Sequence, residues 1–391
     1  MKLRVFARLL LLASPFGVFA VASCATAEEA IGPPDPGATL PGQQEAGSDA
    51  GAVVPDGGCD GSDDDCVTEA ISCDVAAWCP VATNVSSRYA LTSVWGAAPN
   101  DVWAAGSGGT LIHWDGATWK PTATGVRNTF YAVGGSAAND VWAVSSTDVI
   151  FHFDGSKWAL APRATQNDWE SAPLFALRAD GAGNVRVGGR WTTLREPNGD
   201  TRQGNQFVKT TLDGGVAWAG VRGTFTVHGI WGASADDLWL VGDNSEWVSW
   251  QLGVTMHGTR AGGAAEHTWT EVDSQSSVLL EAVWGSSAND VWAVGDNGTI
   301  RRFVAGATEW AIVPAPTREA LHAVWGASAS DVWAVGESGT ILHFDGTTWS
   351  PSVAAFPVNK KRPHLYGVWG SSANDVWIVG DGIALRHGGP K

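Results

Sequence analysis

The amino-acid sequence predicts an all-β protein whose main domain is a seven-bladed β-propeller with four-stranded blades. Three observations predict this fold: a motif that recurs about every 40 to 50 residues, short apolar runs separated by turn dipeptides, and an excess of tryptophan. The chain has 391 residues, with 23 Trp and 49 Gly but only 2 Met and 3 Tyr. Such a skewed composition is typical of one motif copied many times.

The N-terminus predicts an export signal followed by a lipid anchor. A basic start precedes an apolar stretch over residues 9–22, which is too short to span a bilayer. The residues leading to Cys24 resemble the lipobox of bacterial lipoproteins, in which that thiol receives diacylglycerol. The resemblance implies a signal peptide over residues 1–23 and, because residue 25 is Ala rather than Asp, an outer-membrane destination. Ordinary cleavage after Ala22 or Ala27 is the alternative.

Residues 24–72 predict a disordered acidic tether. Eleven acidic residues and no Lys or Arg lie between Ala25 and Ser72, among many Gly, Pro and Ala. The acidic run over 56–66 offers only weak calcium binding, because its spacing does not match an EF-hand loop; we expect no other cofactor. If Cys24 is lipidated, an even number of cysteines remains, which suits two disulfides with three possible pairings: Cys59, Cys66, Cys73 and Cys79.

Residues 73–391 contain seven repeats of the motif. Its central Asp, or the equivalent residue, is found at Asp101, Asp140, Asn184, Asp237, Asp290, Asp331 and Asp375. In the third repeat, residues 174–189 align without gaps with residues 321–336, which places Asn184 in the Asp column. Each repeat predicts four strands, as over 91–96, 101–106, 110–114 and around Trp119. Their apolar runs suit blades that are buried on both faces.

Tryptophan marks the same positions in most repeats. Eighteen of the 23 Trp fill columns in the predicted first, second and fourth strands. Each buried ring removes roughly 150–250 Å² from water, so we expect these rings to join the blades rather than bind a ligand. The last repeat has no fourth-strand Trp, whereas the segment around Trp78 resembles the one around Trp119. The sequence therefore predicts that a strand near Trp78 completes the last blade and closes the ring.

One turn carries a family signature. Residues 211–218 match the Asp-box pattern Ser/Thr-x-Asp-x-Gly-x-x-Trp. With the Trp-rich repeats, this resembles the BNR-type propellers of bacterial surface lipoproteins. Sialidases share the Asp-box propeller, but the Arg-Ile-Pro motif that marks them is missing from the sequence. Tyr131 and Tyr366 occupy the same repeat column, which indicates a blade position rather than a nucleophile.

Basic residues form one candidate ligand site. Four arginines stand seven residues before the first-strand Trp column, in neighbouring blades one, two, six and seven, with two lysines beside the last: Arg88, Arg127, Arg318, Arg362, Lys360 and Lys361. They predict an arc of cations at one mouth of the channel that binds an anion or carboxylate. The alternative is that each arginine pairs with a nearby Asp or stacks on a Trp.

An insertion in the third repeat, residues 189–204, forms a second candidate. It lengthens the hairpin between the second and third strands, on the face that carries the arginines. Trp and Arg are frequent anchors at interfaces, and this region with a nearby long loop contains Trp169, Arg190, Trp191, Arg195 and Arg202. The alternative is an inert insertion.

Three residues form a weak metal candidate. His228, Glu281 and His322 stand three residues before the first-strand Trp column on consecutive blades, so they could converge. The alternative is ordinary packing and hydrogen bonding.

The composition limits the function. A formal charge of −16 argues against a general nucleic-acid binder, and no nucleophile motif or phosphate loop is visible. The sequence predicts a monomeric, non-catalytic binding or assembly module on the cell envelope, which recognises protein or glycan and touches the membrane only through its lipid. A glycan hydrolase or lyase is the first alternative, and a purely structural surface lipoprotein is the second.

Overall fold

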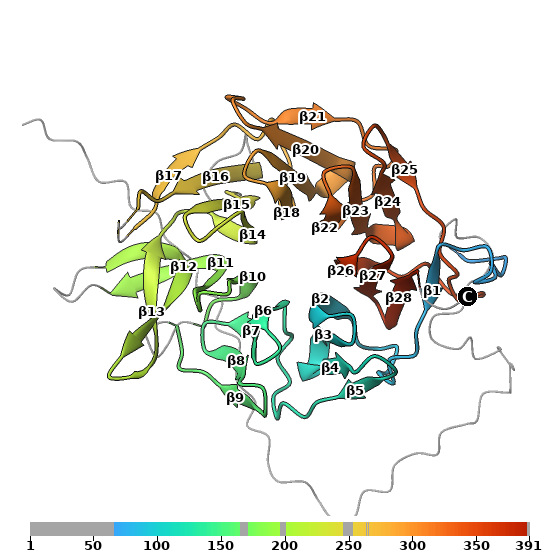
Figure 1. The fold of residues 1–391 in the computed structure, drawn as a ribbon, viewed down its shortest axis with the longest axis horizontal. Helices are drawn as coiled ribbons and strands as arrows, with labels where there is room; N and C mark the ends of the chain where they lie inside the picture. The colour runs from blue at the N-terminus through green and yellow to red at the C-terminus, as the bar shows by residue number, and fades with distance from the viewer. Residues whose placement is uncertain are drawn as a thin grey trace, which may run out of the picture. The chain divides into compact units, whose positions relative to one another are not determined.

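The protein forms a ring of seven antiparallel four-stranded sheets around a central channel, seen end-on in Figure 1. The computed structural model describes residues 66–164, 171–195, 201–244, 253–262, 264 and 266–388. These residues belong to a compact unit that begins at Val54. Within the described ranges, no helix is both long enough and apolar enough to cross a membrane. The predicted all-β, seven-bladed propeller is confirmed.

The first four blades follow the chain in order, each running from an inner to an outer strand. Blade one consists of β2 (Leu91–Ala98), β3 (Asp101–Gly106), β4 (Leu111–Trp114) and β5 (Trp119–Pro121). Blade two consists of β6 (Ala132–Ala137), β7 (Asp140–Ser146), β8 (Val149–Phe153) and β9 (Trp158–Leu160). Blade three consists of β10 (Leu174–Ala179), β11 (Val185–Arg195), β12 (Thr201–Leu212) and β13 (Gly215–Arg222). Blade four consists of β14 (Thr226–Gly232), β15 (Asp237–Asp243), β16 (Gly253–Thr259) and β17 (Thr268–Glu271).

The remaining blades keep the same order, except that the last one borrows a strand. Blade five consists of β18 (Leu280–Ser287), β19 (Asp290–Gly295), β20 (Thr299–Val304) and β21 (Ala311–Val313). Blade six consists of β22 (Leu321–Ser328), β23 (Asp331–Gly336), β24 (Ile341–Phe344) and β25 (Trp349–Pro351). Blade seven consists of β26 (Leu365–Ser372), β27 (Asp375–Gly380), β28 (Ile383–His387) and β1 (Trp78–Pro80).

The N-terminal strand β1 closes the ring by pairing antiparallel with β28. Trp78 lies opposite His387 in the register and is fully buried. Its indole meets that of Trp333 edge-on at 4.9 Å, and its N–H donates to Ser352 Oγ at 3.2 Å. Because β1 covers the outer edge of β28, an N-terminal and a C-terminal segment of the described chain are joined in one sheet. The predicted closing strand is confirmed.

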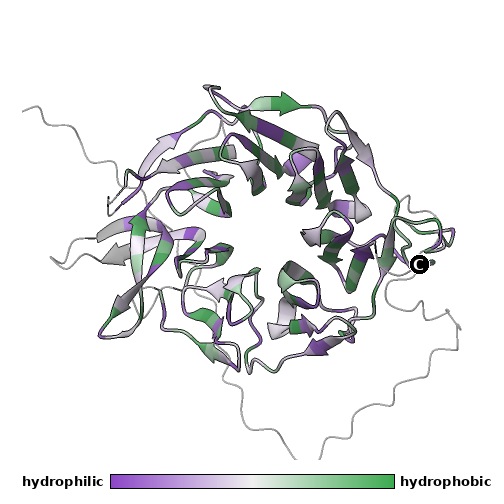
Figure 2. Cartoon of the chain, in the orientation of Figure 1, coloured by the Kyte–Doolittle hydropathy of each residue, from purple (hydrophilic) through white to green (hydrophobic). Residues whose placement is uncertain are grey.

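Tryptophan pairs join the blades. At six of the seven interfaces, the second-strand Trp of one blade meets the fourth-strand Trp of the next with centroids 4.9–5.8 Å apart and planes at 80–88°. Edge-to-face contacts are a preferred geometry for aromatic rings. At the seventh interface, between blades three and four, Arg186 replaces the second-strand Trp and lies 5.6 Å from the Trp269 ring. Figure 2 shows that hydrophobic segments recur in the strands around the ring.

An Asp and a His or Arg side chain lie beside the second-strand Trp in six blades. The carboxylate at the start of the second strand contacts a His or Arg on the third strand, and that side chain lies over the indole ring. The sets are Asp101–His113–Trp103, Asp140–His152–Trp142, Asp237–His257–Trp239, Asp290–Arg302–Trp292, Asp331–His343–Trp333 and Asp375–Arg386–Trp377. Blade three departs from this pattern: Asn184 replaces the Asp, and Val208 lies opposite Arg186.

The segment before β1 is attached to the ring near residues 359–361. Val67 N–H donates to the Lys360 carbonyl at 3.0 Å, and Cys66 forms a β-bridge with Lys361. Cys73 and Cys79 form a disulfide, and Cys66 is disulfide-bonded as well. Cys24 and Cys59 lie outside the described residues. The described part of the chain thus begins within the predicted tether.

Candidate functional site at the channel mouth

The first strands of all seven blades surround the central channel, a cavity of ≈ 550 Å³. Near its start, each first strand contributes one side chain to a ring, which we call the channel belt: Thr92, Tyr131, Phe175, His228, Glu281, His322 and Tyr366. The belt lies at the face where the first strands begin. The hairpins between second and third strands lie at the same face, because successive strands in each blade run antiparallel.

Belt side chains contact one another from blade to blade. Tyr131 meets Phe175 edge-on at 5.1 Å, and Phe175 stacks on His228 at 5.0 Å. Glu281 Oε2 lies 3.4 Å from His228 Nδ1, and Glu281 Oε1 lies 4.0 Å from His322 Nδ1. The His322 and Tyr366 rings are 5.3 Å apart. The belt is therefore aromatic on one side of the channel and charged on the other.

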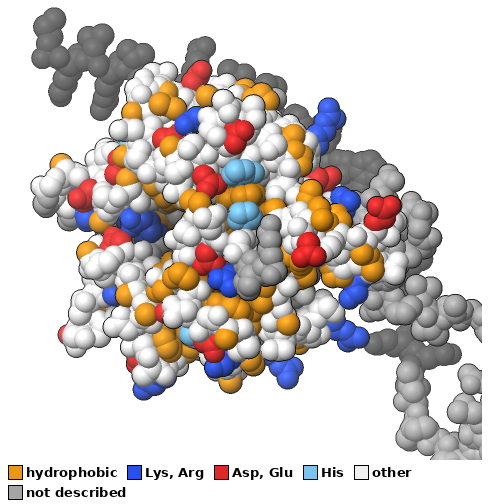
Figure 3. Space-filling model, turned by 45° about the vertical axis from the view of Figure 1, so that its right-hand side comes forward, with side chains coloured by type: hydrophobic (Ala, Val, Ile, Leu, Met, Phe, Trp, Pro, Cys, Tyr) orange, Lys and Arg blue, Asp and Glu red, His pale blue; other side chains and the backbone are white. Residues whose placement is uncertain are grey.

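A second row of acidic side chains lies beside the charged part of the belt. It occupies one repeat column, at or just beyond the end of the second strand, in four consecutive blades, and we call it the acidic arc: Asp243, Asp296, Glu337 and Asp381. Asp243 Oδ2 lies 3.0 Å from His228 Nε2, and the Tyr366 hydroxyl donates to Asp381 at 3.4 Å. Figure 3 shows acidic and histidine side chains next to one another near the middle of the visible face.

The pKa values at this mouth report a negative field. Burial by itself would lower the pKa of His228, but its contacts with Asp243 and Glu281 outweigh burial and raise that pKa to about 9. Burial, and then the charge of Glu281, raise the pKa of the Asp296 carboxyl. Burial and Asp381 raise the pKa of Tyr366 to about 12. The acidic arc contributes four carboxylates and Glu281 a fifth. The protonated His228 offsets the charge of only one of them.

The structure brings the three metal candidates together. Glu281 lies between His228 and His322 and contacts a ring nitrogen of each. Among the residues that the structure describes, no group of three or more His, Cys, Asp or Glu side chains could hold a metal. The metal site at these three residues stays a prediction.

The four predicted arginines lie on the belt face, outside the channel. Each is exposed in the loop before a first strand, and their blades are neighbours around the ring (Figure 1). None of them lines the channel cavity, and no ion pair joins them to another described residue. We call them the arginine rim: Arg88, Arg127, Arg318 and Arg362. Lys360 and Lys361 are exposed beside Arg362.

The insertion extends the β11–β12 hairpin on this same face. Pairing continues out to Arg195, which lies opposite Thr201, while Leu194 lies opposite Arg202. Arg190 is exposed and Trp191 is half-buried. The side chains of Arg195 and Arg202, and all of Trp169, lie outside the described residues.

Comparisons with known proteins establish the fold. No family model and no curated protein match the chain. Among solved structures, it is similar to YCF48 bound to D1 peptide, with 18% identity, a TM-score of 0.57, and coverage of 82% of this chain and 97% of that one. YCF48 from Cyanidioschyzon merolae has 17% identity and a TM-score of 0.57, with 80% and 99% coverage. The RRP9 WD40 repeats have 8% identity and a TM-score of 0.55, with 78% and 98% coverage.

The Asp-box resemblance stays a prediction, because these similar structures are YCF48 and WD40 propellers. The turn itself lies between β12 and β13, where the resemblance places it. Asp213 and Gly214 both adopt positive φ there, at 51° and 80°.

Sequence reasoning missed the acidic arc. The signal was present, because the four carboxylates occupy the same position of four repeats. The alignment of the repeats does not show which columns lie side by side in space. Only the folded ring places this column beside the charged part of the belt.

Proposed function

We propose that the protein is a non-catalytic binding module that holds a segment of another protein at the mouth of the propeller channel. The observation that carries this proposal is the channel belt, which combines an open cavity, aromatic faces and a surplus of negative charge. A cationic side chain of the partner suits both the charged and the aromatic side of the channel belt, because it is attracted to carboxylates and to the faces of aromatic rings. Tyr131, 38% exposed, supplies such a ring.

The arginine rim indicates which residues flank the cation in the partner segment. Its exposed guanidinium groups attract acidic residues that flank the bound cation. The partner segment is therefore one basic residue between acidic neighbours. A YCF48 propeller with a bound D1 peptide supports peptide binding as a role that this fold can take.

We further propose that the module is displayed on the cell envelope by a lipid on Cys24. The support is the N-terminal sequence: a basic start, a short apolar stretch and the lipobox-like residues before Cys24. The acidic residues 25–72 then act as a spacer between membrane and propeller.

The experiment is cross-linking of the anchored, full-length protein in membranes, followed by affinity measurements on the captured segment. The E281Q/D381N double variant should bind at least about tenfold more weakly, since each lost charge-assisted contact costs roughly 1.5–3 kcal/mol. Glu309→Gln is the matched control: this carboxylate is exposed away from the channel, and its loss should leave affinity unchanged.

Other outcomes would redirect the proposal. Capture of glycans in place of a peptide would support the glycan alternative, and turnover of a glycan that is abolished in E281Q would establish an enzyme. Replacing the four arginines of the rim by Gln should weaken capture most at low salt. If capture is unchanged, the rim has no part in binding.

A further inference from the structure

Blade three replaces two tryptophans of the repeat by arginines. In the gap-free alignment of residues 174–189 with 321–336, Arg178 takes the position of Trp325 and Arg186 that of Trp333. The third-strand position that carries a His or Arg in the other six blades is Val208 here. The blade has thus kept a cation beside Trp269 of the next blade but lost the Asp that would neutralise it.

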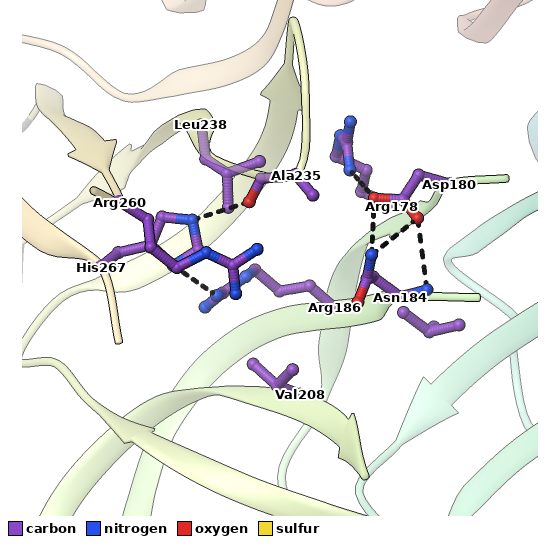
Figure 4. A pocket seen from close by; sticks show the side chains of 10 residues that line it. Arg178, Asp180, Asn184, Arg186, Val208, Ala235, Leu238, Arg260 and His267 are labelled. Carbon is purple, nitrogen blue, oxygen red and sulfur yellow. Dashed lines mark hydrogen bonds and ion pairs between the residues drawn. The ribbon is translucent and has the colours of Figure 1, made fainter. Parts of the chain in front are cut away.

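These substitutions leave a cavity between blades three and four. It has a volume of ≈ 40 Å³ and is lined by both arginines together with Arg260 and His267 of blade four. Figure 4 shows Arg186 close to Arg260 and His267, with Arg178 beside Asp180 and Asn184. The cavity lies at the turns that end the first and third strands, which is the face opposite the channel belt.

Two of the three guanidinium groups have a carboxylate partner. Arg178 Nη1 lies 3.2 Å from Asp180 Oδ2, and Arg260 Nε lies 2.5 Å from Asp236 Oδ1. Arg178 also donates to the Gly232 carbonyl at 3.2 Å. Three guanidinium charges therefore stand against two carboxylates, which leaves one positive charge over.

Arg186 holds the surplus charge. It donates from Nη1 to the buried Gln206 Oε1 at 2.8 Å and from Nη2 to His267 Nδ1 at 3.3 Å. No carboxylate among the described residues pairs with it. A guanidinium has five N–H groups, so three find no acceptor within the described part of the chain.

His267 does not compensate for this charge. Its Nε2 lies 2.9 Å from the Ala235 carbonyl, which can only accept, so Nε2 carries the proton and Nδ1 accepts from Arg186. Burial and then the charge of Arg186 lower the pKa of His267, so the ring stays neutral. Burial, with Arg260 and Arg178 nearby, lowers the pKa of Arg186 to about 10, which still leaves the guanidinium protonated at neutral pH.

We propose that this cavity is a binding site for one small oxyanion, seated on the free N–H groups of Arg186 and flanked by Arg178 and Arg260. A guanidinium matches the paired oxygens of a carboxylate or phosphate. The volume corresponds to on the order of three water molecules, so the site accepts a single carboxylate or phosphate group and excludes larger ligands. The anion comes from solution or from an acidic side chain of a partner.

The test is thermal unfolding and calorimetry of the whole protein with phosphate, acetate or an end-blocked acidic peptide, at constant ionic strength in chloride. We expect saturable binding that raises the unfolding temperature. R186Q should weaken binding at least about tenfold, because a hydrogen-bonded charge is lost. R186W restores the repeat residue, so it should fold well and also lose binding.

Arg302→Gln is the matched control, because Arg302 also lies over a Trp but is paired with Asp290; it should keep affinity within about twofold. Tighter binding of the peptide than of acetate identifies a partner side chain as the source, and the reverse identifies a free anion. No saturable effect of any of the three probes, or an equal effect in R186W, overturns the proposal. Because the site and its variants lie on the opposite face from the channel belt, this result is independent of the partner capture described above.

Discussion

Histidine occupies two kinds of position in this propeller, and its neighbours decide its role. In four blades a third-strand His lies between an Asp and the face of a Trp, as His113 does at 2.6 Å from Asp101 and 4.2 Å from Trp103. These residues belong to the repeat and join the strands of each blade. His228 lies in the channel belt instead, between Asp243 and Glu281. There the same side chain becomes a half-buried cation.

The charge of His228 predicts how stability depends on pH. Its folded-state pKa of about 9 lies above the ordinary value of 6.5, so its contribution is fully present below about pH 6.5 and lost as pH rises through 9. The shift corresponds to about 3 kcal/mol. Urea unfolding of the wild type and H228Q at pH 6 and pH 9.5 should show a stability difference that shrinks at the higher pH. A difference that does not change with pH would contradict this assignment, since all other titrating groups are common to both proteins.

At the scale of elements, Trp pairs join the strands of neighbouring blades. How deeply each fourth-strand Trp is buried depends on the side chain that it meets in the adjacent blade. Trp78 of β1 is fully buried against Trp333, whereas Trp269 of β17 is half-buried against Arg186. The first strands pack just as tightly: a Cβ added to Gly326 of β22 would lie 2.6 Å from the Trp284 ring. Glycine there is required by the close approach of the neighbouring blade.

Replacing the Trp of the closing strand should destabilise the protein more than replacing the equivalent Trp of blade four. Trp78→Ala removes a fully buried indole and should destabilise the propeller by about 3–5 kcal/mol. Trp269→Ala is the matched control from the same repeat column, and it should cost clearly less because its ring is half-buried. Denaturant unfolding measures both. Equal losses would contradict the idea that the fuller burial of Trp78 makes its contact the stronger one.

At the scale of the whole molecule, the two faces of the ring differ in chemistry. The belt face combines an acidic mouth with exposed arginines outside it, while the opposite face holds the small cationic cavity between blades three and four. The two proposed sites therefore lie on opposite faces of the ring. The proposed attachment to the cell envelope depends on the N-terminal residues instead.

Replacement of Cys24 tests the proposed anchor. In a bacterial host, the full-length protein should be recovered with membranes and carry diacylglycerol on its N-terminal cysteine by mass spectrometry. C24A should be recovered in the soluble fraction, because no lipid then holds it. A wild-type protein that is soluble and begins at residue 23 or 28 would show ordinary cleavage instead.

The candidate sites were predictable only in part. The belt residues and the arginine rim follow from repeat columns, since a column has the same place in every blade. The acidic arc and the cavity at Arg186 were not predicted, although each leaves a trace in the alignment: four acidic residues in one column, and arginines in place of Trp325 and Trp333. Their chemistry depends on side chains from neighbouring blades, and alignment within a repeat does not pair one blade with the next.

By itself, the sequence determined the number of blades, the four strands in each and the borrowed strand β1. These features come from local patterning and from one motif that recurs along the chain. Only the tertiary structure decided which side chains meet across blades: His228 with Glu281, and Arg186 with His267 but with no carboxylate. The physical reason is that the charge of a site is the sum over neighbours, and around a ring those neighbours come from different repeats.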